Sequence, residues 1–290
     1  MKIIDLPPVA PTLIESTRAI GYSLEAAVAD IIDNSIAAKA TSVNIAFFPL
    51  DGAYISILDN GVGMNSSELT TAMQYGSQNP LNSRSAEDLG RFGLGLKTAS
   101  LSQCRILTVV SKQGDYIGAR RWDIDYVCTT GEWSLIDLDD KEMDSVPNIE
   151  DLKALKSGTL VVWQNLDRMQ AGTIDFTQSM GKQIDAVRDH LSLVYHRYLT
   201  GEQGLEKLTI SINGLLVEPA DPFMVKKSDQ TMQEETYKIN GSIIKVQPYI
   251  LPHISKMTPD EIKAAGGKEG LRKLQGFYVY RNKRLLVWGT

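Results

Sequence analysis

The chain has 290 residues, 43% of them hydrophobic, with 30 lysines and arginines against 35 aspartates and glutamates. This length suits two domains, and the composition supports full hydrophobic cores, which excludes fibrous and wholly disordered classes. The net charge of −5 gives no overall electrostatic signature of a nucleic-acid-binding protein.

The cysteines and the apolar pattern indicate a reducing compartment. Cys104 and Cys128 match no metal-binding or redox spacing, so we interpret them as small buried hydrophobic residues in a reducing compartment. The N-terminus lacks the apolar core of a signal peptide, and no run of about 18 apolar residues occurs. We therefore expect a cytoplasmic protein without a membrane span.

Helical and strand signals alternate through the first hundred residues. An extended, proline-rich start through Pro11 precedes a short helix that Gly21 ends, and Ser23 is a plausible N-cap for the main helix. Asp51-Gly52 is typical of a hairpin turn. The predicted elements are helices at 13–20, 23–39 and 66–75, strands at 43–48 and 54–58, a polar lid at 76–89, and a glycine-rich helix start leading to residue 102.

Strand signals dominate after residue 105, and a long helix precedes a change of pattern near Gly201. We expect a first, larger domain over residues 1–205 and a second, smaller domain over residues 206–290. The predicted elements are strands at 106–111, 116–122, 133–138 and 160–163, an irregular acidic surface segment at 139–156, a helix at 176–199, and strands at 208–212, 215–217, 242–250 and 277–280 with helices near 259–264 and 271.

An acid and an amide stand one turn apart on the main helix. Asp30 and Asn34 are four residues apart and therefore share a helix face. Such a pair could hold a water and a metal ion at a bound phosphate, although an ordinary solvated helix face has the same pattern.

A second motif, Gly90-Arg91-Phe92-Gly93-Leu94-Gly95, opens a helix and is followed by Lys97. Its spacing fits neither the dinucleotide fingerprint nor the phosphate loop. Glycines let the backbone approach a ligand closely, and the unpaired N–H groups of a helix start attract anions. Tight packing of a helix start explains the glycines equally well.

A third motif, Asp59-Asn60-Gly61-Val62-Gly63, ends a strand. Asp59 either bonds its own turn or accepts a hydrogen bond from an exocyclic amine at the floor of a pocket. In the second case Gly63 keeps the pocket wall open for a flat ring.

These motifs, together with Gly158-Thr159 at the start of a strand, occur in the order found in one family. From about Gly21 to Val162 the chain closely resembles the GHKL ATPase superfamily, which includes gyrase B subunits, MutL, the ninety-kilodalton heat-shock chaperones, MORC proteins and histidine kinases. The resemblance implies an α/β (α+β sandwich) Bergerat ATP-binding fold. In that fold a mixed sheet is covered by helices on one face, and here a partial transducer-type βαβ domain would follow.

The resemblance also implies a role for each matching residue. Asp30 would activate the attacking water, and Asn34 would coordinate Mg²⁺ at the phosphates. Asp59 would accept the adenine amino group, and Thr159 would complete the adenine end through water. The remaining nucleotide contacts would come from Gly61, Gly63 and Met64 at the base, and from Gly90, Arg91, Phe92, Gly93, Leu94, Gly95 and Lys97 at the phosphates.

Two positions depart from the family pattern. Asp30 stands where the family has glutamate, so the carboxylate is about one methylene shorter and hydrolysis is expected to be slow. Ala37 stands where many members have aspartate.

The segments after residue 206 look most like bacterial MORC-like proteins of the MutL and gyrase B branch, through Ile212-Asn213-Gly214 and the Gly276–Leu286 stretch. In that branch a transducer lysine is expected beyond Arg284, so either this domain is truncated or its switch differs. We expect an ATP-dependent homodimer, and DNA as a partner by resemblance only. The alternative is a nucleotide-gated clamp with little or no hydrolysis.

Overall fold

The structure is a computed structural model that describes residues 3, 6–19, 21–76, 95–171, 175–228, 230–259, 262, 270 and 275–289. The chain divides into two compact units. The first contains Met1–Leu191 and Tyr198–Glu218, and the second contains Ser192–Arg197 and Pro219–Thr290. Each unit is treated by itself below.

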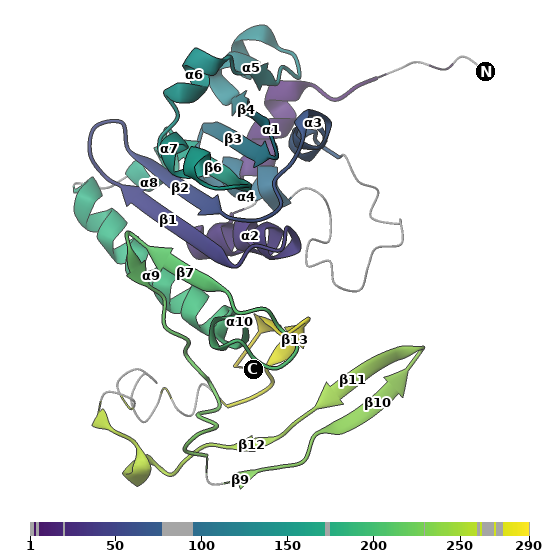
Figure 1. Ribbon diagram of the computed structural model, residues 1–290, viewed down its shortest axis with the longest axis vertical. Coiled ribbons are helices and arrows are strands. Elements are labelled where there is room, and N and C mark those ends of the chain that lie inside the picture. Colours follow the sequence, from purple (N-terminus) through teal and green to yellow (C-terminus); the bar gives the residue numbers. More distant parts are fainter. Residues whose placement is uncertain are drawn as a thin grey trace. The chain divides into compact units, whose positions relative to one another are not determined.

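One mixed sheet of eight strands, in the order β5-β4-β3-β6-β2-β1-β7-β8, organises the first unit (Figure 1). β1 and β7 pair in parallel, and the other neighbouring strands pair antiparallel. The strands are β1 (Ser42–Phe48), β2 (Tyr54–Asp59), β3 (Ile106–Gln113), β4 (Tyr116–Asp123), β5 (Ile136–Asp137), β6 (Gly158–Gln164), β7 (Thr209–Ile212) and β8 (Leu215–Leu216).

Local capping explains where several helices start. Pro11 lies in the first turn of α1, where its missing N–H costs nothing, so this helix begins earlier than predicted. Ser23 caps α2 as predicted, by accepting the Ala26 N–H. The helices are α1 (Ala10–Arg18), α2 (Leu24–Ala37), α3 (Ser66–Met73), α4 (Gly95–Gln103), α5 (Ile124–Thr130), α6 (Asp140–Asp144), α7 (Ile149–Ala154), α8 (Asp167–Gln170), α9 (Phe176–Val194) and α10 (His196–Thr200).

Both faces of the sheet are covered. α2 packs against α4 on the face that carries Asp59, whose carboxylate bonds Ser35 of α2. The α6–α7 segment packs on the other face, where Met143, Ile149 and Leu152 meet alternate residues of β2, β3 and β6. The mixed sheet of an α/β fold is thus as expected, but helices also cover the second face. The irregular surface segment predicted at 139–156 is wrong, because it forms these two helices.

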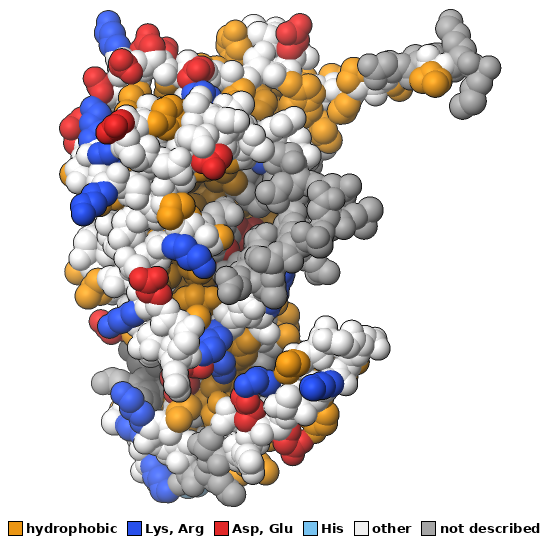
Figure 2. All heavy atoms as spheres, turned by 45° about the vertical axis from the view of Figure 1, so that its right-hand side comes forward, with side chains coloured by type: hydrophobic (Ala, Val, Ile, Leu, Met, Phe, Trp, Pro, Cys, Tyr) orange, Lys and Arg blue, Asp and Glu red, His pale blue; other side chains and the backbone are white. Residues whose placement is uncertain are grey.

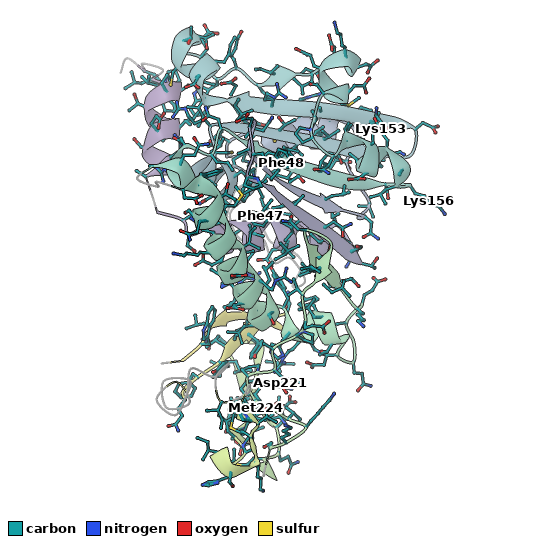
Figure 3. The ribbon with its side chains drawn as sticks, turned by 90° about the vertical axis from the view of Figure 1, so that its left-hand side faces the viewer. Phe47, Phe48, Lys153, Lys156, Asp221 and Met224 are labelled. Atoms are coloured by element: carbon teal, nitrogen blue, oxygen red, sulfur yellow. The ribbon has the colours of Figure 1, made fainter. Side chains whose placement is uncertain are left out.

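β1 is an inner strand of the sheet, because β2 pairs with it on one side and β7 on the other. Phe47 of β1 is buried and Phe48 is partly exposed, stacked on Tyr54 at 5.2 Å between ring centroids (Figure 3). Asn213, in the turn after β7, accepts the Phe47 N–H at 2.8 Å. β7 and β8 lie within the domain predicted to start at residue 206, but the pairing of β7 with β1 makes both strands part of the first unit.

The second unit contains antiparallel strand pairs, β10 (Glu235–Ile239) with β11 (Ser242–Val246), β9 (Gln230–Thr231) with β12 (Tyr249–Ile250), and β13 (Val279–Arg281) with β14 (Arg284–Val287). Asn240 and Gly241 both have positive φ, as a tight two-residue hairpin turn requires. A βαβ unit needs two parallel strands, whereas the strand pairs described in this unit are all antiparallel. The expected βαβ arrangement is therefore not seen among its described residues. The helix predicted near 271 lies outside the described residues, as does most of the one near 259–264.

Aromatic rings form the centre of the second unit. Phe223 stacks on Tyr249 at 4.2 Å, and the His196 ring lies beside Tyr280, with its Nε2 atom 2.8 Å from the Tyr280 hydroxyl. Met224, labelled in Figure 3, has a positive φ in the loop that the Asp221 carboxylate closes through the N–H groups of Phe223 and Val225. In the part of the chain that the structure describes, no helix is both long and apolar enough to cross a membrane.

Candidate functional site

The candidate site is organised by a row of three polar side chains on neighbouring strands. Asp59 of β2 is in register with Thr159 of β6, which is in register with Ser111 of β3. Residues in register across neighbouring strands lie on the same face of a sheet. The row therefore crosses the face that α2 and α4 cover, at the end of β2 where Asp59 joins its glycine-rich turn.

Asp59 is a buried carboxylate that accepts several hydrogen bonds. Its Oδ2 atom accepts the Ser35 hydroxyl at 2.9 Å, and its Oδ1 atom accepts the N–H groups of Gly61 at 2.8 Å and Thr159 at 3.3 Å. Burial raises the pKa of Asp59, while the bonds from Gly61, Ser35 and Thr159 oppose that rise. A carboxylate has about four acceptor positions, so three protein donors leave capacity for one more.

Glycines surround this carboxylate because neighbouring backbone leaves no room for a side chain. A Cβ on Gly63 would lie 1.9 Å from the Lys112 carbonyl oxygen, and Gly63 has φ of +70°. A Cβ on Gly158 would lie 2.2 Å from the Asp59 carbonyl oxygen, and one on Gly61 would lie 2.8 Å from that of Ala38. These close approaches hold the ends of α2, β2, β3 and β6 together.

Asp30 and Asn34 lie on α2, as the helix prediction requires. Asn34 is exposed, and Asp30 is partly buried. The Asp30 carboxylate is hydrogen-bonded to the hydroxyl of Tyr22, whose pKa is raised by burial and by the negative charge of Asp30. A Cβ on Gly95 would lie 3.9 Å from Asp30 Oδ2, so Asp30 faces the start of α4.

Lys97 lies in the first turn of α4 and is almost fully buried. Its Nζ atom donates to the Ala72 carbonyl of α3 at 2.7 Å, and burial lowers its pKa to about 8. The neighbouring Met73 carbonyl accepts the indole N–H of Trp122 at 2.9 Å. Lys97 and Trp122 therefore satisfy the carbonyl end of α3, a role that the sequence did not indicate.

The structure brings the predicted site residues together in two groups. The first contains Asp59, Gly61, Gly63, Met64 and Thr159, with the Met64 N–H bonded to Ser111 Oγ at 2.9 Å. The second contains Asp30, Asn34 and Gly95. Gly90, Arg91, Phe92, Gly93 and Leu94 lie outside the described residues.

Several residues at the site were not predicted from the sequence. Ser35 and Ser111 contact Asp59 and Thr159 directly, the Ser157 hydroxyl donates to the Gly61 carbonyl at 2.7 Å, and Tyr22 bonds Asp30. Ser35 could have been found, because it follows Asn34 on the same helix. The pairing of β3 with β6, which brings Ser111 to the site, has no signal in the local sequence.

The first unit also has a hollow on its surface, which lies away from Asp59 and offers few polar side chains. This open hollow of about 790 Å³ is lined by residues 48–53, Gln170, Phe176 and Thr177. It lies at the turn end of β2, a strand length from Asp59, and its ionisable side chain is Asp51. Among the described residues, no group of three or more His, Cys, Asp or Glu could hold a metal ion.

One comparison with known proteins matches the part of the chain that contains these residues. A family model described as "Histidine kinase-, DNA gyrase B-, and HSP90-like ATPase" matches residues 22–159. The matched segment starts at Tyr22 and ends at Thr159, so it contains both groups of residues described above. No match was found among curated proteins. The family match shows that this part of the chain is similar to the GHKL superfamily, and the mixed sheet is consistent with the Bergerat fold.

Proposed function

We propose that the protein binds ATP with Mg²⁺ at the row of Asp59, Thr159 and Ser111, and hydrolyses it slowly. The observation that carries this proposal is the buried Asp59 carboxylate, which has three protein donors and capacity for a fourth. An adenine amino group is a donor of the required kind. The GHKL-type family match to the same residues supports the choice of nucleotide.

The residues present fit such a ligand. Gly61, Gly63 and Gly158 allow the backbone to close around Asp59 in a way that any side chain would block. At the other group, Asn34 offers an exposed amide oxygen, a hard donor that suits Mg²⁺ held mainly by phosphates. Gly90 to Gly95 would bind phosphates through their N–H groups, and Lys97 would move from the Ala72 carbonyl to a phosphate.

Asp30 is the proposed general base. Its carboxylate would take the proton from the attacking water, and the hydrogen bond from Tyr22 would hold it toward the start of α4. Aspartate reaches about one methylene less far than glutamate, which is why we propose slow turnover.

Phosphate release by three variants tests this role. Asp30→Ala should lower the rate by about 100-fold or more at unchanged ATP affinity. Asp30→Glu should restore or raise the rate, because it extends the carboxylate without changing its charge. Glu25→Ala is the control, since it removes a carboxylate from the first turn of the same helix. Equal rates for wild type and Asp30→Ala would remove Asp30 from the mechanism.

A nucleotide-gated clamp with little or no hydrolysis is the second candidate. Asp30 and Ala37 favour it, because the helix carries a short acid and lacks the second carboxylate of many family members. A clamp would bind ATP tightly in the presence of Mg²⁺ and release phosphate no faster than the background rate. Closure would then be driven by the difference in ATP affinity between the open and closed states.

The proposed output is lid closure by the segment at 76–89 and ATP-dependent homodimerisation, as in the MORC-like, MutL and gyrase B branch. The second unit, from Pro219 onward, would act as a transducer-like domain. Most of that lid segment lies outside the described residues. DNA is a candidate partner by resemblance alone. The face shown in Figure 2 adds no support, because acidic and basic side chains are intermixed on it and form no basic patch. Light scattering with and without a non-hydrolysable ATP analogue tests dimerisation, and a steep salt dependence of DNA binding would indicate phosphate contacts.

A further inference from the structure

The hydroxyl of Ser111 is completely buried and lies within hydrogen-bonding distance of three groups. These are the Met64 N–H at 2.9 Å, the Gly158 carbonyl oxygen at 3.1 Å and the Thr159 hydroxyl at 3.1 Å. A hydroxyl has one proton to donate and two lone pairs that accept. The three neighbours therefore use its whole capacity, and the chemistry of two of them fixes the third.

Only one arrangement of protons satisfies all three contacts at once. The Met64 N–H can only donate, so it takes one lone pair of Ser111. The Gly158 carbonyl can only accept, so it takes the Ser111 proton. In this arrangement one lone pair of Ser111 remains, and it accepts the proton of the Thr159 hydroxyl.

Thr159 is consequently left with lone pairs only. Its neighbour in the row, Asp59, also accepts when it is ionised. Two adjacent side chains at the site thus offer acceptors and no side-chain donor. We infer that Ser111 is a positioning residue for base selectivity, because it makes Thr159 an acceptor and so favours a base that presents an amino group over one that presents a carbonyl.

This inference rests on the proposed function, namely that a nucleotide base binds beside Asp59 and Thr159. ATP and ITP are the probes, since ITP has a carbonyl in place of the C6 amino group, which is the group that Asp59 and Thr159 would contact. Without the Ser111 hydroxyl, Thr159 is free to rotate and donate to that carbonyl. ITP binding should then improve relative to ATP binding.

Ser56→Ala is the matched control for Ser111→Ala. Ser56 is also a buried serine of this sheet, in β2, but its hydroxyl bonds Asn148 at the start of α7 on the opposite face. Both variants lose one buried hydroxyl and some stability. A loss of stability alone would lower the affinities for ATP and ITP together and leave their ratio unchanged.

The experiment is a calorimetric measurement of the dissociation constants of ATP and ITP for wild type, Ser111→Ala, Thr159→Val, the double variant and Ser56→Ala. The preference of wild type for ATP should fall by about tenfold in Ser111→Ala and in Thr159→Val. The double variant should show no further fall, because Ser111 acts through Thr159. Ser56→Ala should keep the wild-type ratio.

An unchanged ratio in Ser111→Ala, or a further fall in the double variant, would overturn the role of Ser111. Should Ser111→Ala fail to fold, Thr159→Val decides, and an unchanged ratio there overturns the inference. If wild type binds ATP and one of these results is found, the role of Ser111 is wrong but the proposed function still holds. Wild type that binds neither nucleotide overturns both.

Discussion

The two ends of the candidate site are built in different ways. At the end with Asp59, three side chains on neighbouring strands share one row. Asp59 and Ser111 are held by hydrogen bonds to backbone groups, and Thr159 is held by the Ser111 hydroxyl. At the end with Asp30, the groups lie on a helix face and at a helix start, and Lys97 is bonded to the α3 carbonyl end. A sheet fixes side chains through strand register, whereas helix ends are free to exchange partners. We therefore expect the first end to determine which ligand binds and the second to respond to it.

The largest effect should come from the backbone that encloses Asp59. Gly63→Ala places a Cβ 1.9 Å from the Lys112 carbonyl at a φ of +70°, and should lower the free energy of unfolding by about 4 kcal/mol. Gly52→Ala is the control, because its φ is +74° and nothing lies within 4 Å of the added Cβ. It should cost only about 1 kcal/mol. Chemical denaturation measures both, and equal losses would show that the close approach is not what matters.

The next effect concerns the carboxylate itself. Asp59→Ala should weaken ATP binding by about 100-fold, or about 3 kcal/mol, because it removes a charged acceptor and leaves the N–H groups of Gly61 and Thr159 unsatisfied. Asp139→Ala, at the N-cap of α6, removes a capping carboxylate elsewhere and should leave ATP affinity unchanged. Calorimetric titration checks both, and an Asp59→Ala variant with wild-type affinity would argue against the base end.

At the Asp30 end of the site, Lys97 should make the free energy of unfolding depend on pH. Below about pH 8 the lysine is charged in both the folded and the unfolded chain, so the cost of burying the charge is fully present. Above that pH the folded protein releases a proton that the unfolded chain still holds, and stability rises with pH. Relative to Lys97→Met, wild type should gain about 2 kcal/mol from about pH 7.5 to about pH 9.5. A constant difference across this range would show that Lys97 stays charged when buried.

The same lysine should report phosphate binding. If Lys97 leaves the Ala72 carbonyl for a phosphate, its pKa should rise, and ATP binding near pH 8.5 should take up a proton. Calorimetry in buffers of different ionisation enthalpy measures this uptake. Lys97→Met should bind ATP without it.

The smallest effect concerns Tyr22. Tyr22→Phe removes the hydroxyl that bonds Asp30 while keeping the ring, and should lower the rate of phosphate release by about fivefold, or about 1 kcal/mol. ATP affinity should stay the same, because Tyr22 contacts the proposed base rather than the nucleotide. A change in affinity with an unchanged rate would give Tyr22 a different role.

Local signals predicted the parts of the fold that local chemistry decides. Ser23 as a cap and Asp51-Gly52 as a turn are both found, because each acts within a few residues of itself. The helix α6 was missed although Asp139 and Glu142 form a capping box, since the acidic composition suggested a surface segment. The strand predicted at 133–138 shrinks to Ile136–Asp137, and the helix predicted at 176–199 is interrupted at Tyr195.

Some residues of the candidate site could likewise be predicted from local sequence, and others could not. Asp59 and its glycines follow from a motif in consecutive residues, whereas Ser111 comes close to them only through the pairing of β3 with β6. Tyr22 likewise reaches Asp30 across the N-terminal turns of α2. Which groups meet across strands is decided by the register of the whole sheet, and no short window of sequence contains that information.

The parallel pairing of β1 with β7 has a consequence for biosynthesis. Ser42 to Ile45 pair with Thr209 to Ile212, so β1 emerges from the ribosome long before its second neighbour exists. Until then it is an edge strand with unpaired N–H and C=O groups, which invites association with other chains. A fragment that stops at residue 205 would keep this edge permanently, and is expected to aggregate where one that extends through Glu218 folds.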